Sequence, residues 1–209
     1  MSGIPIPNDA YDGLLSTCAS ASVPVPDNFN YLSFKVFVQV VHAGLGELVM
    51  FLVPPTPLNE PVKRLELMHR PGVDAPDDGT NNGGSKVELL YTLTFDDAAT
   101  LSSENLENLA SAKIIPDGAT VSSSGINYPK ISTVFNGNAL GTWTLYVGDA
   151  VPGGNSGTIR AFGLKFSEQE SPSTRPSSKP SSKPSTKPSA KPSSKPSSTP
   201  SECIAKFHA

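Results

Sequence analysis

The sequence predicts an all-β sandwich domain followed by a disordered tail. Three observations lead to this prediction. Short runs rich in β-branched and aromatic residues recur along residues 1–170, and clusters of Gly, Pro, Asn and Asp separate these runs. From Ser171 onward the composition changes abruptly to Pro, Ser and Lys. Many short strands with turns every 8–12 residues or so are typical of β-sandwiches, whereas a Pro/Ser/Lys repeat cannot build a core.

Five runs have the composition of strands, and the third and fourth alternate clearly between apolar and polar residues. They are Leu32–Val41, Glu47–Val53, Lys86–Phe95, Thr142–Val147 and Thr158–Phe166. Alternation puts Trp143 on the same face as Leu145 and Val147, so we expect this ring in the core rather than at a sugar-binding surface. One weak helical pattern covers Thr100–Ala110. The segment 75–84, APDDGTNNGG, lacks the spacing of an EF-hand and predicts a loop.

The change in composition divides the chain into three parts. Residues 1–170 form the predicted domain, 171–201 a disordered Pro-Ser-Lys repeat linker, and 202–209 a short C-terminal tail. In the linker, Pro recurs every fourth residue from Pro176 to Pro200, and there is no apolar face to offset the entropy of ordering. The linker is expected to be partly polyproline II, and either a spacer or a polycation that binds an acidic cell-wall or surface polymer.

Charge divides at the same boundary. Residues 1–170 hold 9 basic and 18 acidic residues, a net charge of −9, and residues 171–209 carry +6. An acidic domain is a poor partner for nucleic acid, because phosphate binding needs clustered Lys and Arg. The acidity suits cation binding, or serves only solubility.

Neither a membrane span nor a signal peptide is visible in this sequence. Cys18 lies in the domain and Cys203 lies beyond the linker. The sequence leaves three states open for them: a bond between the two, two free thiols, or a bond from Cys203 to another chain.

Residues 141–166, GTWTLYVGDAVPGGNSGTIRAFGLKF, resemble the closing motif of the P domain, also called P/Homo B, of subtilisin/kexin-like proprotein convertases. Other stretches resemble the same family in the same order: IPIPND near the start, VFVQVVHAGLGELVMFLVPP, LTFDDAA, and INYPKISTVFNGNALGTW of the bacterial-type branch. Within them Ala43 replaces the family's Thr, Glu47 replaces its Asp, and Phe162 stands where Trp is frequent. The resemblance covers residues 3–168.

The resemblance implies a jelly-roll sandwich that belongs to a secreted or cell-surface protein. It implies an accessory role beside a subtilisin-like serine endopeptidase, whose catalytic domain lies upstream or acts in trans. The chain begins almost at the domain boundary, so we expect a fragment or a truncated start. The rival hypothesis is a stand-alone extracellular binding or adhesion module on a Pro/Ser-rich stalk.

No catalytic triad is visible in the chain. Its histidines are His42, His69 and His208, and no G-x-S-x-G elbow accompanies them. His42 matches a position of the family motif at the end of a strand, and we expect it to be structural.

Calcium is the cofactor that the sequence predicts, because several P domains bind it and hard cations favour carboxylate oxygens. The candidate ligands are carboxylates at expected strand ends and in the opening segment. These are Asp9, Asp12, Glu47, Asp96, Asp97 and Asp149. The competing interpretation is that they are turn-forming, solvated carboxylates.

Overall fold

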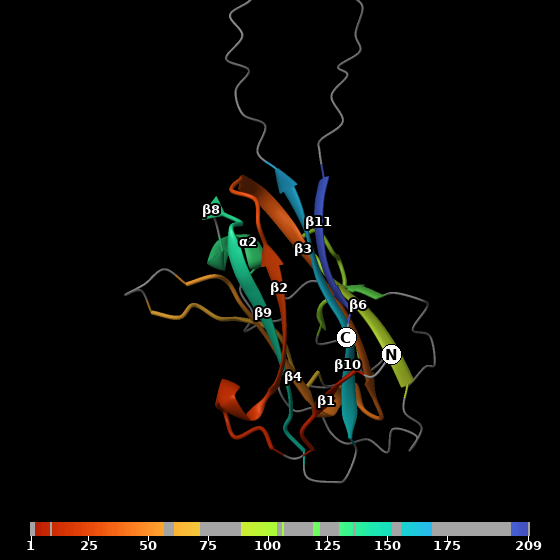
Figure 1. Ribbon diagram of the computed structural model, residues 1–209. Coiled ribbons are helices and arrows are strands. Elements are labelled where there is room, and N and C mark those ends of the chain that lie inside the picture. The colour runs from red at the N-terminus through yellow and green to blue at the C-terminus, as the bar shows by residue number, and fades with distance from the viewer. Residues whose placement is uncertain are drawn as a thin grey trace, which may run out of the picture.

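Strands drawn from the whole chain assemble into two facing β-sheets in the computed structural model (Figure 1). The structure describes residues 3–8, 10–56, 61–71, 89–103, 106, 119–121, 130–135, 137–151, 156–168 and 202–208. The predicted all-β sandwich is confirmed. The linker and the loop at 75–84 lie outside the described residues, as does most of the expected helix over Thr100–Ala110.

The first sheet has the order β1-β10-β3-β6-β7, and its neighbours are antiparallel except β6 and β7. A short strand, β8, pairs with the start of β3, and the last strand, β11, pairs with β10. The bounds are β1 Ile4–Ile6, β10 Gly157–Glu168, β3 Asn30–His42, β6 Leu89–Phe95, β7 Ala119–Val121, β8 Gly137–Asn138 and β11 Glu202–His208.

The second sheet is antiparallel, with the order β2-β9-β4-β5. Short helices flank the strands of both sheets. The strands are β2 Ala19–Val25, β9 Gly141–Asp149, β4 Leu48–Val53 and β5 Leu65–His69, and the helices are η1 Leu15–Thr17, η2 Leu45–Glu47 and α2 Ile131–Val134.

All five predicted strands are present, with boundaries that differ by a few residues. Glu47 ends η2 instead of beginning β4, and residues 86–88 lie outside the described part. Sequence reasoning missed β2 because its inward residues are small, in the pattern ASASVPV, and because Pro24 interrupts it. A proline is tolerated there because β2 is at the edge of its sheet.

The core lies between the sheets and is centred on Trp143, which is 1% exposed as its alternation predicts. The indole packs against four aromatic rings, and its Nε1–H donates a hydrogen bond of 2.9 Å to the carbonyl of Ala139. The ring centroids lie 5.1–6.3 Å from that of Trp143 and belong to Phe34, Phe166, Phe135 and Tyr31.

Residues 202–208, assigned to the C-terminal tail from the sequence, form β11 beside β10 (Figure 1). The pairing is antiparallel and runs from Ala161 opposite His208 to Ser167 opposite Glu202. β11 thus extends the edge of the first sheet that β1 covers at Gly157–Ile159.

Candidate functional site

One group of metal-ligating side chains, His42, Glu47 and Asp149, stands out among the described residues. Ligand atoms of these three residues all lie within 4.8 Å of one another. All three residues are buried, with exposures of 0%, 1% and 1%. Carboxylates are almost never fully buried unless they are paired, so this cluster is the strongest candidate for a functional site.

Strand pairing brings the three residues together from distant parts of the sequence. His42 is the last residue of β3 in the first sheet, and Asp149 is the last residue of β9 in the second. Because β4 runs antiparallel to β9, Leu48 lies opposite Asp149. The N–H of Ala150 also donates to the carbonyl of Glu47 at 2.8 Å. The cluster therefore lies where the two sheets meet at one end of the sandwich.

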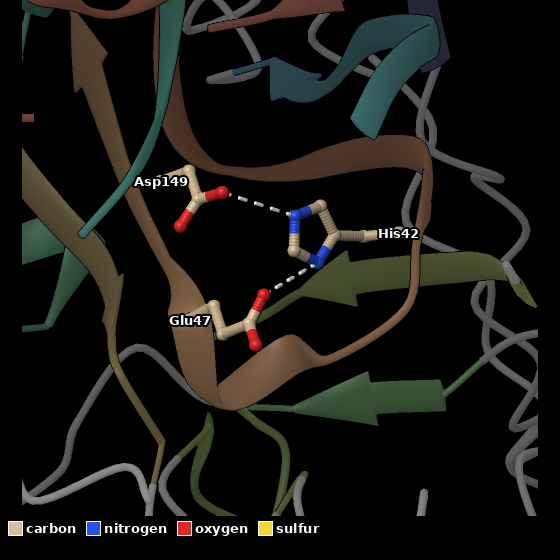
Figure 2. Close-up of side chains that lie close together, drawn as sticks. All are labelled: His42, Glu47 and Asp149. Atoms are coloured by element: carbon tan, nitrogen blue, oxygen red, sulfur yellow. Dashed lines mark ion pairs between the residues drawn. The ribbon is translucent and has the colours of Figure 1, made fainter. Parts of the chain in front are cut away.

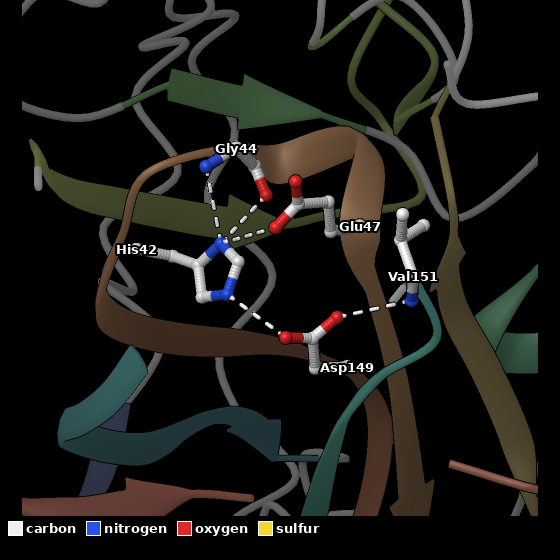
Figure 3. A network of polar contacts seen from close by, with 5 residues as sticks. All are labelled: His42, Gly44, Glu47, Asp149 and Val151. Atoms are coloured by element: carbon white, nitrogen blue, oxygen red, sulfur yellow. Dashed lines mark hydrogen bonds and ion pairs between the residues drawn. The ribbon is translucent and has the colours of Figure 1, made fainter. Parts of the chain in front are cut away.

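The imidazole lies between the two carboxylates, as Figure 2 shows. His42 Nδ1 is 3.7 Å from Glu47 Oε2, and His42 Nε2 is 3.5 Å from Asp149 Oδ2. On the Nδ1 side the ring also lies 2.8 Å from the carbonyl oxygen of Gly44, and on the other side Asp149 Oδ1 accepts from Val151 N–H at 3.1 Å (Figure 3). Backbone groups thus fix both the ring and one carboxylate.

Two atoms of the cluster are left without a hydrogen bond. His42 Nε2 and Asp149 Oδ2 are fully buried, and neither has a partner within hydrogen-bonding geometry among the described residues. A separation of 3.5 Å between them exceeds the 2.7–3.2 Å or so of an N–H···O hydrogen bond. Unsatisfied buried polar atoms are rare and costly, so this pair requires an explanation.

Tyr91 of β6 has a pKa above the usual value for a tyrosine. Burial raises the pKa of its hydroxyl, and the negative charge of Glu47 raises it further. β6 pairs with β3, the strand that ends at His42.

Of the six carboxylates predicted as calcium ligands, the structure brings together Glu47 and Asp149. Asp9 lies outside the described residues. Asp12 is exposed, and its Oδ1 accepts hydrogen bonds from Leu14 N–H and the Thr17 hydroxyl, both at 3.0 Å. This is the turn-forming role that short acidic side chains commonly play.

Asp96 and Asp97 also have local partners. The carboxylate of Asp97 accepts from the backbone N–H groups of Ile131 and Ser132, at 2.7 and 2.8 Å, and so caps α2. Asp96 forms an ion pair of 2.6 Å with Lys35 and accepts from Ala98 N–H at 3.0 Å. Calcium binding by Asp96 and Asp97 stays a prediction.

Sequence reasoning missed His42 as the centre of the cluster, although the pattern contained a signal. His42 has the same parity as Val36, Val38 and Val40, and all four face the core. A histidine at the end of a strand is expected to be buried when it lies on the same face as the strand's apolar residues. Glu47 and Asp149 were among the six candidate carboxylates, but their contact with His42 was not predicted, because Asp149 lies more than 100 residues away in the sequence.

The Asp96 ion pair makes stability depend on pH. Burial alone would raise the pKa of Asp96, but hydrogen bonds from Lys35 and Ala98 and the charge of Lys35 outweigh it and lower the pKa below 3.8. The contribution is therefore present above pH 3.8 and is lost as pH falls through the folded-state pKa. We expect Asp96→Asn to cost about 0.5–1 kcal/mol at pH 7, because Lys35 is half exposed.

Urea denaturation of the wild type and Asp96→Asn at pH 7 and pH 2.5 measures this difference. The difference should be smaller at pH 2.5 than at pH 7, and Asp27→Asn, at an exposed position, serves as the control. A loss of equal size at both pH values would contradict the ion-pair explanation.

The cluster lacks the parts of a nucleophilic catalyst. The hydrogen bonds and ion pairs of His42 within the described residues reach Gly44, Glu47 and Asp149, and none reaches a serine, threonine or cysteine. Cys18 is a free thiol. Burial, followed by the charge of Asp12, raises its pKa to about 11, so the thiol is protonated at neutral pH.

No helix among the described residues has the length and apolarity needed to span a membrane. No protein-family model and no curated protein matches the chain. Among solved structures, it is similar to the serine protease of Aeromonas sobria, with a TM-score of 0.36, 14% identity and 80% of this chain covered. A second structure, of that protease in complex with a chaperone, gives the same TM-score and identity over 79% of this chain. The chain spans about a fifth of the length of the solved protease chains that it matches.

Proposed function

We propose that this chain is an accessory domain of the P/Homo B type, associated with a secreted or cell-surface subtilisin-like serine endopeptidase. Its role is to pack against a catalytic domain and to stabilise or regulate it. The catalytic Asp, His and Ser belong to another part of the polypeptide or to a partner. The calcium dependence that the resemblance implies belongs to this proposal, as does binding of an acidic polymer by the Lys-rich linker.

The observation that carries the proposal is the meeting of two motifs that are far apart in the sequence. VFVQVVHAGLGELVMFLVPP supplies His42 and Glu47, and GTWTLYVGD supplies Asp149. His42 and Asp149 match their family motifs in residue type, and Glu47 is a carboxylate where the family motif has Asp. Their side chains form one buried cluster. Two short motifs that resembled the family by chance would not be expected to bring their polar residues together in this way.

The encoding transcript, read to its 5′ end, gives the first test. We expect a signal peptide and a subtilisin-like catalytic domain upstream of this chain. A signal peptide followed directly by SGIPIPND would contradict this arrangement and favour the stand-alone binding module on a Pro/Ser-rich stalk.

A second test uses the longer polypeptide. Removal of residues 1–170 should shorten the half-life of peptidase activity at elevated temperature several-fold, because lost domain packing speeds irreversible unfolding. A variant with the catalytic serine replaced by alanine sets the background of the assay. An unchanged half-life and unchanged activity would argue against an accessory role.

A further inference from the structure

The outer edge of β10 is divided between two segments from opposite ends of the chain. β1 pairs with Gly157–Ile159, and β11 pairs with Ala161–Ser167. The register of β10 on its other neighbour, β3, shifts between Ile159 and Ala161, at the exposed Arg160. The two segments therefore meet at an irregularity of β10, and β11 covers the longer part of the edge.

β11 also lies where the edges of the two sheets come close to each other. β2, the edge strand of the second sheet, lies near both β10 and β11. The core residues of β10 along this edge are at most 1% exposed, and they are Phe162, Leu164 and Phe166. A strand edge with unpaired backbone groups readily pairs with another extended segment, and β11 does so here (Figure 1).

The sequence of residues 202–208, ECIAKFH, fits this position. Residues that lie directly opposite each other on paired strands share a face of the sheet. The register places three residues of β11 opposite the core residues of β10, namely Cys203 opposite Phe166, Ala205 opposite Leu164 and Phe207 opposite Phe162. Three of the four residues at the alternate positions are polar or charged, and these are Glu202, Lys206 and His208. This alternation is typical of a strand with one face toward a core.

The segment is connected to β10 through a long stretch of chain. β10 ends at Glu168 and β11 begins at Glu202, and Glu202 lies opposite Ser167. The intervening residues 169–201 include the linker, so they leave and rejoin the sheet at the same end of β10. A segment joined in this way acts as a ligand that is held near its site, at an effective concentration on the order of millimolar.

We propose that the β10 edge from Ala161 to Ser167 is a binding site for an extended peptide, and that residues 202–208 of the same chain are its tethered ligand. Recognition is by strand addition, in which backbone hydrogen bonds supply affinity and the side chains at alternate positions supply selectivity. Another extended segment gains access to the edge only by displacing β11. The proposal is independent of the protease association and of calcium.

The first test detaches the strand in the full 209-residue chain. Ala205→Pro removes a backbone N–H and fixes φ in the middle of β11, which should prevent its pairing with β10. Ala190→Pro makes the same change in the linker and is the matched control. We expect faster amide hydrogen exchange over residues 161–167 in Ala205→Pro alone. Its Tm should also fall by about 3–6 °C, because a ligand bound to the folded state stabilises it.

The second test supplies the ligand from outside. A fluorescently labelled peptide, SECIAKFHA, is titrated under reducing conditions into each chain, and binding is followed by anisotropy. The Ala205→Pro chain should bind the peptide at least about tenfold more tightly than the wild type, because the wild-type site is already occupied by the tethered segment. A peptide that carries the Ala205→Pro change should bind to neither chain.

A cleavable linker covers the case in which Ala205→Pro does not fold. A protease recognition site is inserted into the linker of the otherwise wild-type chain, which is folded first and then cut. Dilution should release the C-terminal fragment, and the emptied domain should then bind the labelled peptide.

Three results would overturn the proposal. The first is equal hydrogen exchange over residues 161–167 and equal Tm in Ala205→Pro and Ala190→Pro. The second is peptide binding that is equally tight for the wild type and the emptied site, or absent from both. The third is a wild-type dimer at micromolar concentration that separates in Ala205→Pro, since the ligand would then come from a second copy. None of these measurements uses peptidase activity, so they are separate from the proposed function.

Discussion

Trp143→Ala is expected to lower the free energy of unfolding by about 3–5 kcal/mol, the usual cost of truncating a buried aromatic residue to alanine. The indole is 1% exposed and packs against four aromatic rings, three from the first sheet and one from the segment after α2. Its removal leaves a cavity in the centre of the core and an unpaired carbonyl at Ala139.

Urea denaturation followed by far-UV circular dichroism measures this effect, because Trp143 is the single tryptophan and its fluorescence disappears with the substitution. Trp143→Phe provides the matched variant. It keeps most of the ring packing but loses the hydrogen bond of Nε1, and we expect it to cost about 1–2 kcal/mol. A loss below about 1 kcal/mol for Trp143→Ala would place the indole outside the core.

Gly157→Ala is expected to cost about 3 kcal/mol, at the upper end of the usual range for overpacking. A Cβ at this position would lie 2.5 Å from Cδ2 of His42 and 3.0 Å from both Ile6 Cδ1 and the carbonyl oxygen of Val41. The ring of His42 cannot move away freely, because both of its nitrogens face fixed groups. The methyl group would thus displace either the imidazole or the first residue of β10.

Thermal unfolding of Gly157→Ala and of the neighbouring exposed variant Ser156→Ala compares a crowded position with an open one. The first should lower Tm by about 6–12 °C, and the second should change it little. Equal melting temperatures for the two variants would mean that β10 does not approach His42 as closely as the structure places it.

Much of the fold was predictable from local pattern. The sequences of β3, β6, β9 and β10 alternate or carry β-branched and aromatic residues. Periodicity alone predicts that Trp143 lies in the core, where the structure places it. β2 was not predicted, because its alternating Ala and Ser residues differ little in hydrophobicity. Residues 202–208 escaped as well, because pairing with β10 is decided by the partner strand.

The sequence by itself determined the strand pattern, the acidic domain and the carboxylates worth considering. Only the tertiary structure decided which of them share a site. Asp96 and Asp97 stand next to each other in the sequence, yet one pairs with Lys35 and the other caps α2. Glu47 and Asp149 are far apart in sequence, yet the register of β4 on β9 puts them on either side of His42. Hydrophobic periodicity is a local property, whereas the meeting of polar groups depends on strand register and on how the sheets pack.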